Sequence, residues 1–246
     1  MKTLILATSV ALSTLASLPA QAQSGEATMP LAGQAIRSYL LEHPEVIVEA
    51  LQAYERNQKL EEISAMRDAV YANLDAILNA PGSPVMGNPD GDVTLVEFAD
   101  YSCPHCRSTN AALREVMAAD PDLRVVIKEL PILGEASQLA ARYAKAVYDL
   151  HGSEAYRTVH DALFDRAGQF DVAWLREHTA QMGFDFDEIE DRMFSSELLT
   201  EFNRTADLAK QIGITGTPFL IIGDEVVPGA IGTQDMRMLI AQERAQ

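Results

Sequence analysis

The stretch VTLVEFADYSCPHC, residues 93–106, decides the fold of this chain. It opens with a largely apolar run, residues 93–98, that is typical of a buried strand, and it ends with two cysteines separated by a proline and a histidine. These cysteines, Cys103 and Cys106, are the only two in the 246 residues. A disulfide between them closes so small a loop that it stabilises a protein by only about 2 kcal/mol. We therefore interpret the pair as redox-active rather than as a structural staple.

A metal site is an alternative interpretation of the cysteine pair. Tetrahedral zinc requires four ligands, and the chain offers no second cysteine pair. The remaining histidines are scattered without ligand spacing, and we interpret them as ordinary surface or helix residues: His43, His151, His160 and His178. The sequence therefore predicts no zinc site. Paired thiolates do suit Cu(I), so a copper-binding role stays open as an alternative function.

The first residues predict export. Lys2 gives a positive start, residues 4–18 are apolar, and Ala20-Gln21-Ala22 has the pattern of a cleavage site, so residues 1–22 have the features of a signal peptide. An apolar stretch of about 15 residues is shorter than the roughly 20 that a bilayer span needs, so we expect no stable membrane insertion. Such a bacterial signal indicates the periplasm, where disulfides form and persist.

The composition is that of a globular protein with a strongly acidic surface. Apolar residues make up 48% of the chain, which is enough for a sizeable core. Lys and Arg number 19 against 36 Asp and Glu, and the formal net charge is −17. An acidic surface argues against nucleic acid and anionic membranes as partners.

Residues 23–80 are predicted to form a helical arm. Apolar residues recur there at helical spacing, as in Ile47, Leu51 and Tyr54. Pro44 favours the first turn of a helix, so we expect a break at residues 42–44. A helix continuing from there to Leu78 would extend roughly 50 Å, too far to pack fully on one small domain. We expect the arm to join copies of the chain into a homo-oligomer, and packing of the arm on its own domain is the alternative.

A second domain, residues 85–246, follows a linker rich in Pro, Gly and Ser. A strand, a helix and a second strand are expected at 93–98, 104–119 and 123–128, the alternation of a parallel sheet. Helical spacing fills an insertion at about 134–211. A hairpin around Gly223-Asp224 and a helix at 233–244 close the chain. This order predicts an α/β thioredoxin fold with an all-helical insertion, preceded by the N-terminal helical arm.

Three short motifs carry a family resemblance. Residues 95–98, the Cys103-Pro104-His105-Cys106 run and Thr217-Pro218-Phe219 resemble the DsbA-like thiol:disulfide oxidoreductases of the bacterial periplasm, and the resemblance covers residues 85–246. Residues 36–46 resemble the helical extension of a subset related to the suppressor-of-copper-sensitivity protein ScsC. In that subset some members oligomerise through the extension and act as isomerases.

The order of the motif predicts a different role for each cysteine. Cys103 comes at the start of a helix, where unpaired backbone amides and the helix dipole stabilise a thiolate, so we expect it to be the attacking sulfur. Pro104 suits the first helical turn, and His105 adds a donor or a positive charge near the sulfur. Cys106, one turn later, is expected to be more buried and to resolve the mixed disulfide.

Two further positions take their predicted roles from the resemblance. It implies that Glu97 is a buried acid beside the cysteines, which relays the proton that Cys106 must lose. A solvent-facing strand residue is the alternative for Glu97. The resemblance also implies that the Thr217-Pro218 bond is cis and faces the cysteine pair. There it would expose a backbone edge that binds a client peptide. Thr217 resembles the threonine of isomerase-type relatives rather than the valine common in DsbA.

The sequence therefore predicts a periplasmic thiol:disulfide oxidoreductase that forms or isomerises protein disulfides through Cys103 and Cys106. The chemistry needs no metal or nucleotide cofactor. Its expected partners are client proteins with cysteines and a membrane redox partner, which reoxidises an oxidase or keeps an isomerase reduced. The choice between oxidase and isomerase stays open at this point.

Overall fold

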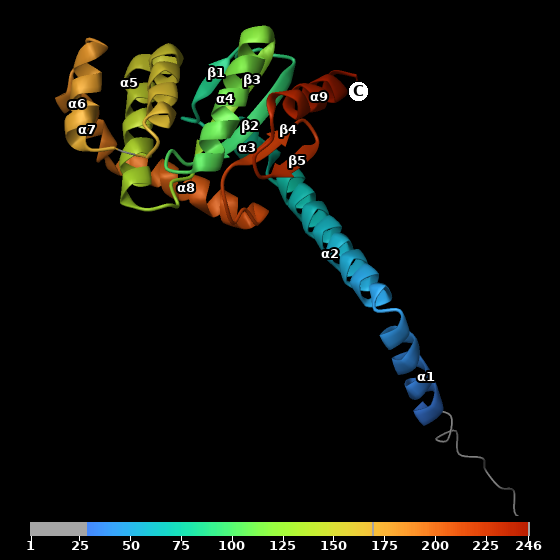
Figure 1. The fold of residues 1–246 in the computed structure, drawn as a ribbon. Coiled ribbons are helices and arrows are strands. Elements are labelled where there is room, and N and C mark those ends of the chain that lie inside the picture. The colour runs from blue at the N-terminus through green and yellow to red at the C-terminus, as the bar shows by residue number, and fades with distance from the viewer. Residues whose placement is uncertain (1–28, 169, 246) are drawn as a thin grey trace, which may run out of the picture. The chain divides into compact units, whose positions relative to one another are not determined.

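The computed structural model describes residues 29–168 and 170–245 of the chain (Figure 1). The predicted signal peptide, residues 1–22, lies outside these residues. The chain divides into two compact units, one ending at Asn57 and one running from Gln58 to the C-terminus. In the part of the chain that the structure describes, no helix is long and apolar enough to cross a membrane.

The first unit is helical and exposes its apolar side chains. Helix α1 (Met29–Glu42) and the start of α2 (Glu45–Ala72) form this unit. The break between them falls where it was predicted, because a residue before a proline disfavours the helical conformation, and Pro44 needs no amide hydrogen at a helix start. The exposed apolar residues are Ile36, Tyr39, Leu41, Ile47, Val48, Leu51 and Tyr54.

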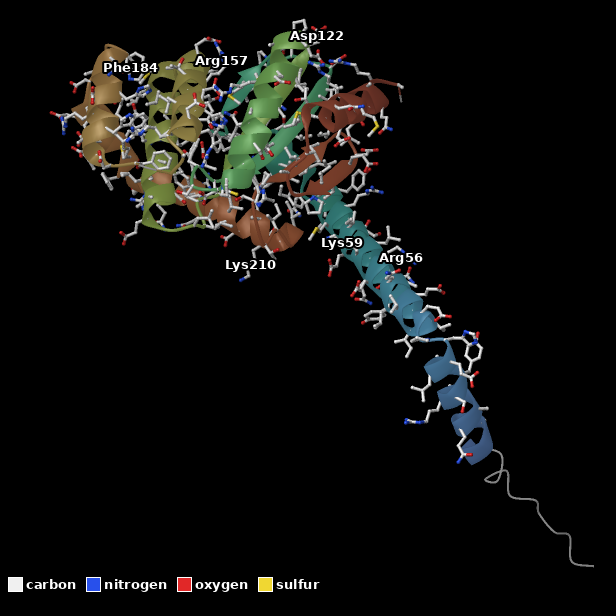
Figure 2. All side chains as sticks on the ribbon, in the orientation of Figure 1. Arg56, Lys59, Asp122, Arg157, Phe184 and Lys210 are labelled. Carbon is white, nitrogen blue, oxygen red and sulfur yellow. The ribbon has the colours of Figure 1, made fainter. Side chains whose placement is uncertain are left out.

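A polar segment of α2 follows the apolar stripe. Arg56 and Lys59 are exposed, and Figure 2 shows both side chains directed away from the helix axis. Lys59 forms an ion pair with Glu62 at 3.6 Å, one turn further along the helix. Charged residues in the middle of α2 therefore separate its exposed apolar part from its C-terminal end.

The end of α2 belongs to the second unit. Asn73 separates α2 from the short helix α3 (Leu74–Leu78), and its side-chain amide donates a hydrogen bond to the carbonyl of Ala69 at 2.8 Å. Val70 and Ile77 are buried, with 3% and 0% exposure, in a cluster that contains strand residues of the sheet. The end of α2 and α3, which were expected to belong to the arm, therefore pack with the sheet-containing unit.

The second unit is built on a mixed five-stranded sheet in the order β1-β3-β2-β4-β5. The central strands β2 and β3 are parallel, and every other neighbouring pair is antiparallel. Helix α4 (Pro104–Ala119) makes the crossover between β2 and β3, as predicted. Strand β1 was not predicted, because three residues are too few to show a periodic pattern. The strands are β1 (Val85–Gly87), β2 (Val93–Ala99), β3 (Leu123–Glu129), β4 (Phe219–Ile222) and β5 (Glu225–Pro228).

Helices cover both faces of the sheet, so its central strands are buried on both sides. One face of β2, with Leu95 and Ala99, packs in a cluster with residues of α4, α5 and the C-terminal helix α9 (Thr233–Arg244). The other face, with Val96 and Phe98, packs with α3 and α8. Because successive side chains of a strand point to opposite faces, Glu97 lies on the same face as Leu95 and Ala99, which is the α4 face.

The predicted helical insertion lies between β3 and β4. Helix α5 is kinked at Gly152, whose φ of 79° is a left-handed conformation that favours glycine. Figure 1 shows α6 and α7 beside α5. Three helices begin with side-chain caps, from Asp171, Asp185 and Ser195. The helices are α5 (Glu135–Asp165), α6 (Val172–Gln181), α7 (Phe186–Met193) and α8 (Ser196–Ile212).

Candidate active site

Cys103 is the N-cap residue of α4. Its backbone is extended, with φ −80° and ψ 120°, and its carbonyl accepts the first helical hydrogen bond from Arg107 at 3.1 Å. Its Sγ donates a hydrogen bond to the carbonyl oxygen of Thr217 at 3.3 Å, and the residue is 5% exposed. The sulfur therefore lies at the positive end of the α4 dipole.

Pro104 and His105 occupy the exposed first turn of α4. Pro104 is the first helical residue, where its missing amide hydrogen costs nothing. His105 is exposed, and its imidazole has no hydrogen bond to any residue that the structure describes. The position of His105 between the two cysteines is therefore the whole structural basis for the role predicted for it.

Cys106 lies one turn deeper and is fully buried, with 0% exposure. Both cysteines are free thiols in this structure. Burial raises the pKa of the Cys106 thiol well above its usual range, and the charge of Glu97 raises it further. Cys106 therefore needs a proton acceptor before it can act as a nucleophile.

Glu97 is buried on β2 beside this thiol, with 0% exposure, so it is not the solvent-facing residue that was considered as the alternative. Neither carboxyl oxygen has a hydrogen-bond partner among the described residues. Burial raises the pKa of Glu97 to about 8, with a further contribution from the negative charge of Glu129. A carboxyl group with this pKa can both give and take a proton near neutral pH.

The segment before β4 completes the site. The Thr217-Pro218 peptide bond is cis. Thr217 is half-buried and Pro218 is buried, and the carbonyl of Thr217 accepts the hydrogen bond from Cys103. The structure thus brings together residues from β2, from the start of α4 and from the loop before β4, which are far apart in the sequence.

A buried polar network, not recognised in the sequence, lies behind the cysteines. The hydroxyls of Tyr101 and Tyr156 donate to Oε1 of Glu129 at 2.9 and 2.7 Å. Nδ1 of His160 lies 2.9 Å from the Tyr101 hydroxyl. Burial lowers the pKa of His160 to about 3, so the ring is neutral, and a proton on Nδ1 lets it donate to Tyr101. His160 was interpreted as an ordinary residue, but the Tyr156–His160 spacing of four on one helix was an available signal.

Asp100 joins the loop before Cys103 to the loop after β3. One of its carboxylate oxygens accepts the backbone N–H of Ser102 at 2.8 Å. The other accepts the backbone N–H groups of Ile132 and Leu133 at 2.8 and 3.0 Å. Asp100 is only 1% exposed, and its carboxylate ties the backbone of this loop, which carries the exposed side chains of Ile132 and Leu133, to the active-site segment.

The structure gives little support to a metal centre outside the cysteine pair. Within residues 29–168 and 170–245, no group of three or more His, Cys, Asp or Glu side chains is arranged to hold a metal ion. The site itself consists of two thiols, one at a helix start and one beside a buried acid.

Comparison with known proteins gives the same result over most of the chain. The DSBA-like thioredoxin domain family matches residues 94–241. The N-terminal domain of the copper resistance protein ScsC matches residues 33–61, in the helical segment before the sheet. Disulfide bond formation protein D of Bacillus subtilis is 23% identical over 184 residues, which are 69% of this chain and 82% of that protein.

Two solved structures illustrate how far the similarity extends. A thioredoxin-like oxidoreductase from Silicibacter pomeroyi is 34% identical with a TM-score of 0.64, and the match covers 70% of this chain and 98% of that one. A linker-deletion variant of Proteus mirabilis ScsC is 25% identical with a TM-score of 0.67, and the match covers 92% of this chain and 99% of that one. The chain therefore belongs to the DsbA-like thiol:disulfide oxidoreductase family, and its N-terminal domain places it in the ScsC-like subset.

Proposed function

We propose that this chain is a periplasmic protein that exchanges disulfides with client proteins through Cys103 and Cys106. The observation that carries the proposal is the contrast between the two thiols. Cys103 lies at the start of α4 with its sulfur on the Thr217 carbonyl, whereas Cys106 is buried beside Glu97. A nucleophile and a resolving thiol need these two environments.

In the oxidative direction, a client thiolate attacks Sγ of Cys103 and breaks the Cys103–Cys106 bond. Cys106 leaves as a thiolate and takes a proton from Glu97. A second client thiol then loses its proton and attacks the client sulfur of the mixed disulfide, which releases Cys103 as a thiolate. Two electrons pass from the client to the cysteine pair, and the client gains one disulfide. The isomerase direction begins instead with attack by Cys103 on a client disulfide.

The backbone of Thr217 is the proposed docking edge for the client. Its carbonyl already accepts the Cys103 thiol, so a peptide aligned along this edge brings its own sulfur close to Cys103. Main-chain pairing gives affinity that does not depend on sequence, which suits an enzyme with many clients. Pro218 has no amide hydrogen to donate, so the backbone of Thr217 supplies the hydrogen-bonding groups of this edge.

Single cysteine variants test the proposal. Cys103→Ser should abolish catalysed exchange, because it removes the attacking sulfur. Cys106→Ser should accumulate mixed disulfides with clients, because the resolving sulfur is lost. Non-reducing gels of the two variants incubated with a scrambled client measure both outcomes. Trapping by the Cys103 variant and none by the Cys106 variant would reverse the assigned roles.

The helical arm is proposed to join copies of this chain. Several large apolar residues among the described residues of the first unit are exposed. Three of them, Ile47, Leu51 and Tyr54, have the spacing of one stripe along α2. Because an exposed stripe of this kind is costly in water, a second copy presenting the same stripe is the proposed partner. An oligomer holds several cysteine pairs near one client, which favours isomerisation over simple oxidation.

Copper binding through the same cysteine pair is the second candidate function. The matched N-terminal domain is described as that of a copper resistance protein, and two thiolates suit Cu(I). The redox state of the pair in periplasmic extract separates the candidates. An oxidised pair favours the oxidase, which a membrane partner must reoxidise. A reduced pair favours the isomerase or the copper role, and addition of Cu(I) to the reduced protein then decides between these two.

A further inference from the structure

The structure leaves open how a proton reaches or leaves Glu97. On its outer side the site is closed, because Cys103 is 5% exposed and Pro218 is buried. A client joined to Cys103 covers this side further while Cys106 gains or loses its proton. Glu97 itself is 0% exposed and has no hydrogen-bond partner among the described residues. The proton therefore needs a route through the interior.

Glu129 is a second buried carboxyl group on the same face of the sheet. In the parallel pair β2 and β3, Glu97 is opposite Ile127, and Ala99 is opposite Glu129. The two glutamates are therefore offset by two residues, on neighbouring strands, and both side chains point to the α4 face. They are close enough for the charge of Glu129 to act on Glu97.

Glu129 is also one of the residues that line a cavity. This cavity of about 380 Å³, called the α8 cavity below, is lined by Glu129, by residues 80–84, by Lys145 and by α8 residues that include Arg204 and Asp207. Arg204 and Asp207 are exposed, so the rim of the cavity lies at the surface. A cavity of this size, with charged residues among those that line it, has room for several water molecules.

The hydrogen bonds of Glu129 fix one of its two carboxyl oxygens. Oε1 accepts the hydroxyls of Tyr101 and Tyr156, whereas Oε2 has no partner among the described residues. One oxygen is thus fixed, and the other is available for a proton.

We propose that Glu129 carries protons between Glu97 and the α8 cavity during turnover. The proton that Cys106 exchanges therefore leaves and enters through the interior, by way of Glu129, rather than past Cys103. This inference rests on the proposed function, since it assigns a residue to the same reaction. Glu129 touches no reacting sulfur, so it acts through Glu97.

The charges around Glu129 are consistent with this role. The pKa of Glu129 is raised to about 7, mainly by burial; the charge of Asp100 also raises it, whereas Tyr156, Tyr101 and Lys145 lower it. The neutral His160 reaches it only through Tyr101. Since the pKa of Glu97 is raised to about 8, a proton passes between the two carboxyl groups with little change in free energy.

Stopped-flow reaction of the reduced protein with excess glutathione disulfide tests the inference. A first phase, which depends on concentration, reports attack by Cys103. A second phase reports attack by Cys106 on the mixed disulfide, in which Cys106 gives its proton to Glu97, the Cys103–Cys106 bond forms and glutathione leaves as a thiolate. Glu129→Gln should slow the second phase about tenfold near pH 7 and remove one of two ionisations from its pH profile, with the first phase unchanged.

Two further variants keep the test decisive. Glu115→Gln is the matched control. Glu115 also accepts a hydrogen bond from a hydroxyl, that of Thr233 at 2.9 Å, but it is exposed on α4. The second phase of this variant should have the wild-type rate. Tyr156→Phe keeps the carboxyl group but removes a donor to it, so it should move one ionisation of the second phase to higher pH. This variant decides the question if Glu129→Gln fails to fold.

The results separate the inference from the function on which it rests. Three results would overturn the role of Glu129 and leave the oxidoreductase function intact. The first is a folded Glu129→Gln protein with the wild-type pH profile. The others are an unshifted profile in Tyr156→Phe and a loss of rate in Glu115→Gln equal to that in Glu129→Gln. A wild-type protein that does not react with glutathione disulfide overturns the proposed function itself.

Discussion

The N-terminal unit and the interior of the sheet-containing unit place side chains against their ordinary preference, but in opposite directions. In the first unit, Leu41 is 68% exposed and Tyr54 is 62% exposed. In the second, Glu97 and His160 are both 0% exposed. Apolar groups in water and ionisable groups in the core are each unfavourable. For the first case we propose a partner that covers the apolar groups, and for the second a reaction that uses a buried proton.

The same helical periodicity leads to opposite results in the two regions. Helix α8 buries Leu198, Leu208 and Ile212 against the second unit. The stripe with Ile47 and Leu51 has the same spacing but is exposed. The pattern in a sequence thus predicts that a face is apolar, but it does not say whether the covering surface belongs to the same chain.

Removal of residues 23–57 gives the largest expected effect on this comparison. The truncated protein should be monomeric by light scattering, because the exposed stripe is gone. Its isomerisation of a scrambled multi-disulfide client should fall at least about tenfold, since a second site no longer acts at high effective concentration. Oxidation of a single dithiol peptide should stay close to the wild-type rate. An unchanged oligomer, or equal losses in both assays, would remove the arm from this role.

The place of the cut is the control for this experiment. A cut at Pro84 also removes Val70 and Ile77, which are buried against the sheet. Each large apolar side chain lost from a core costs about 2–5 kcal/mol, so this shorter protein should lose most of its stability. The protein that begins at Gln58 should unfold at the wild-type urea concentration. If both truncated proteins were equally stable, residues 58–80 would not contribute to the core.

Glu97→Gln tests the buried side of the comparison. The pKa of Glu97 is raised from 4.5 to about 8 in the folded state, so its contribution to stability is fully present below pH 4.5 and is lost as pH rises through 8. From pH 6.5 to 8 the reduced wild-type protein should therefore lose on the order of 2 kcal/mol that the glutamine variant keeps. Urea unfolding of both proteins at the two pH values measures the difference.

Groups that both proteins share cancel from that measurement. The pKa of His160 is lowered to about 3, so its contribution is lost mainly as pH falls below 6.5. The pKa of Lys128 is lowered to about 8, so Lys128 titrates within the range used, but it does so in both proteins. Glu129 changes stability in the same direction as Glu97 but is present in both proteins. Parallel pH dependences in the wild type and the variant would show that Glu97 is already ionised at pH 6.5.

Local patterns in the sequence predicted the parts of the fold that depend on them. The strand at 93–98, the helix that begins after Cys103 and the hairpin at Gly223-Asp224 all follow from short-range periodicity and turn chemistry. Strand β1 and the end of α2 depend on contacts with distant residues, such as that of Val70 with the sheet. The sequence therefore did not predict β1 as a strand, and it predicted the end of α2 as part of the arm.

The site shows the same division. Cys103 and Cys106 are recognisable because their spacing is itself the chemical signal. Tyr101, Glu129 and His160 come from three elements, and only the folded chain brings them together. Glu129 at the end of a buried strand resembles many exposed strand ends in sequence. What distinguishes it is the pair of tyrosine hydroxyls, and no local pattern contains both.

His105→Ser gives the smallest expected effect, because this residue lies on the exposed side of the site. The imidazole is in contact with water, so its influence on the neighbouring sulfur is screened, unlike that of the buried Glu97. We expect loss of the histidine to make the disulfide a weaker oxidant by about threefold in the equilibrium with glutathione, or about 15 mV. Quantifying reduced and oxidised protein across a series of glutathione ratios measures this shift. A shift of tenfold or more would mean that an exposed residue controls the redox equilibrium as strongly as the buried groups, and the contrast between the surface and the interior of the site would then fail.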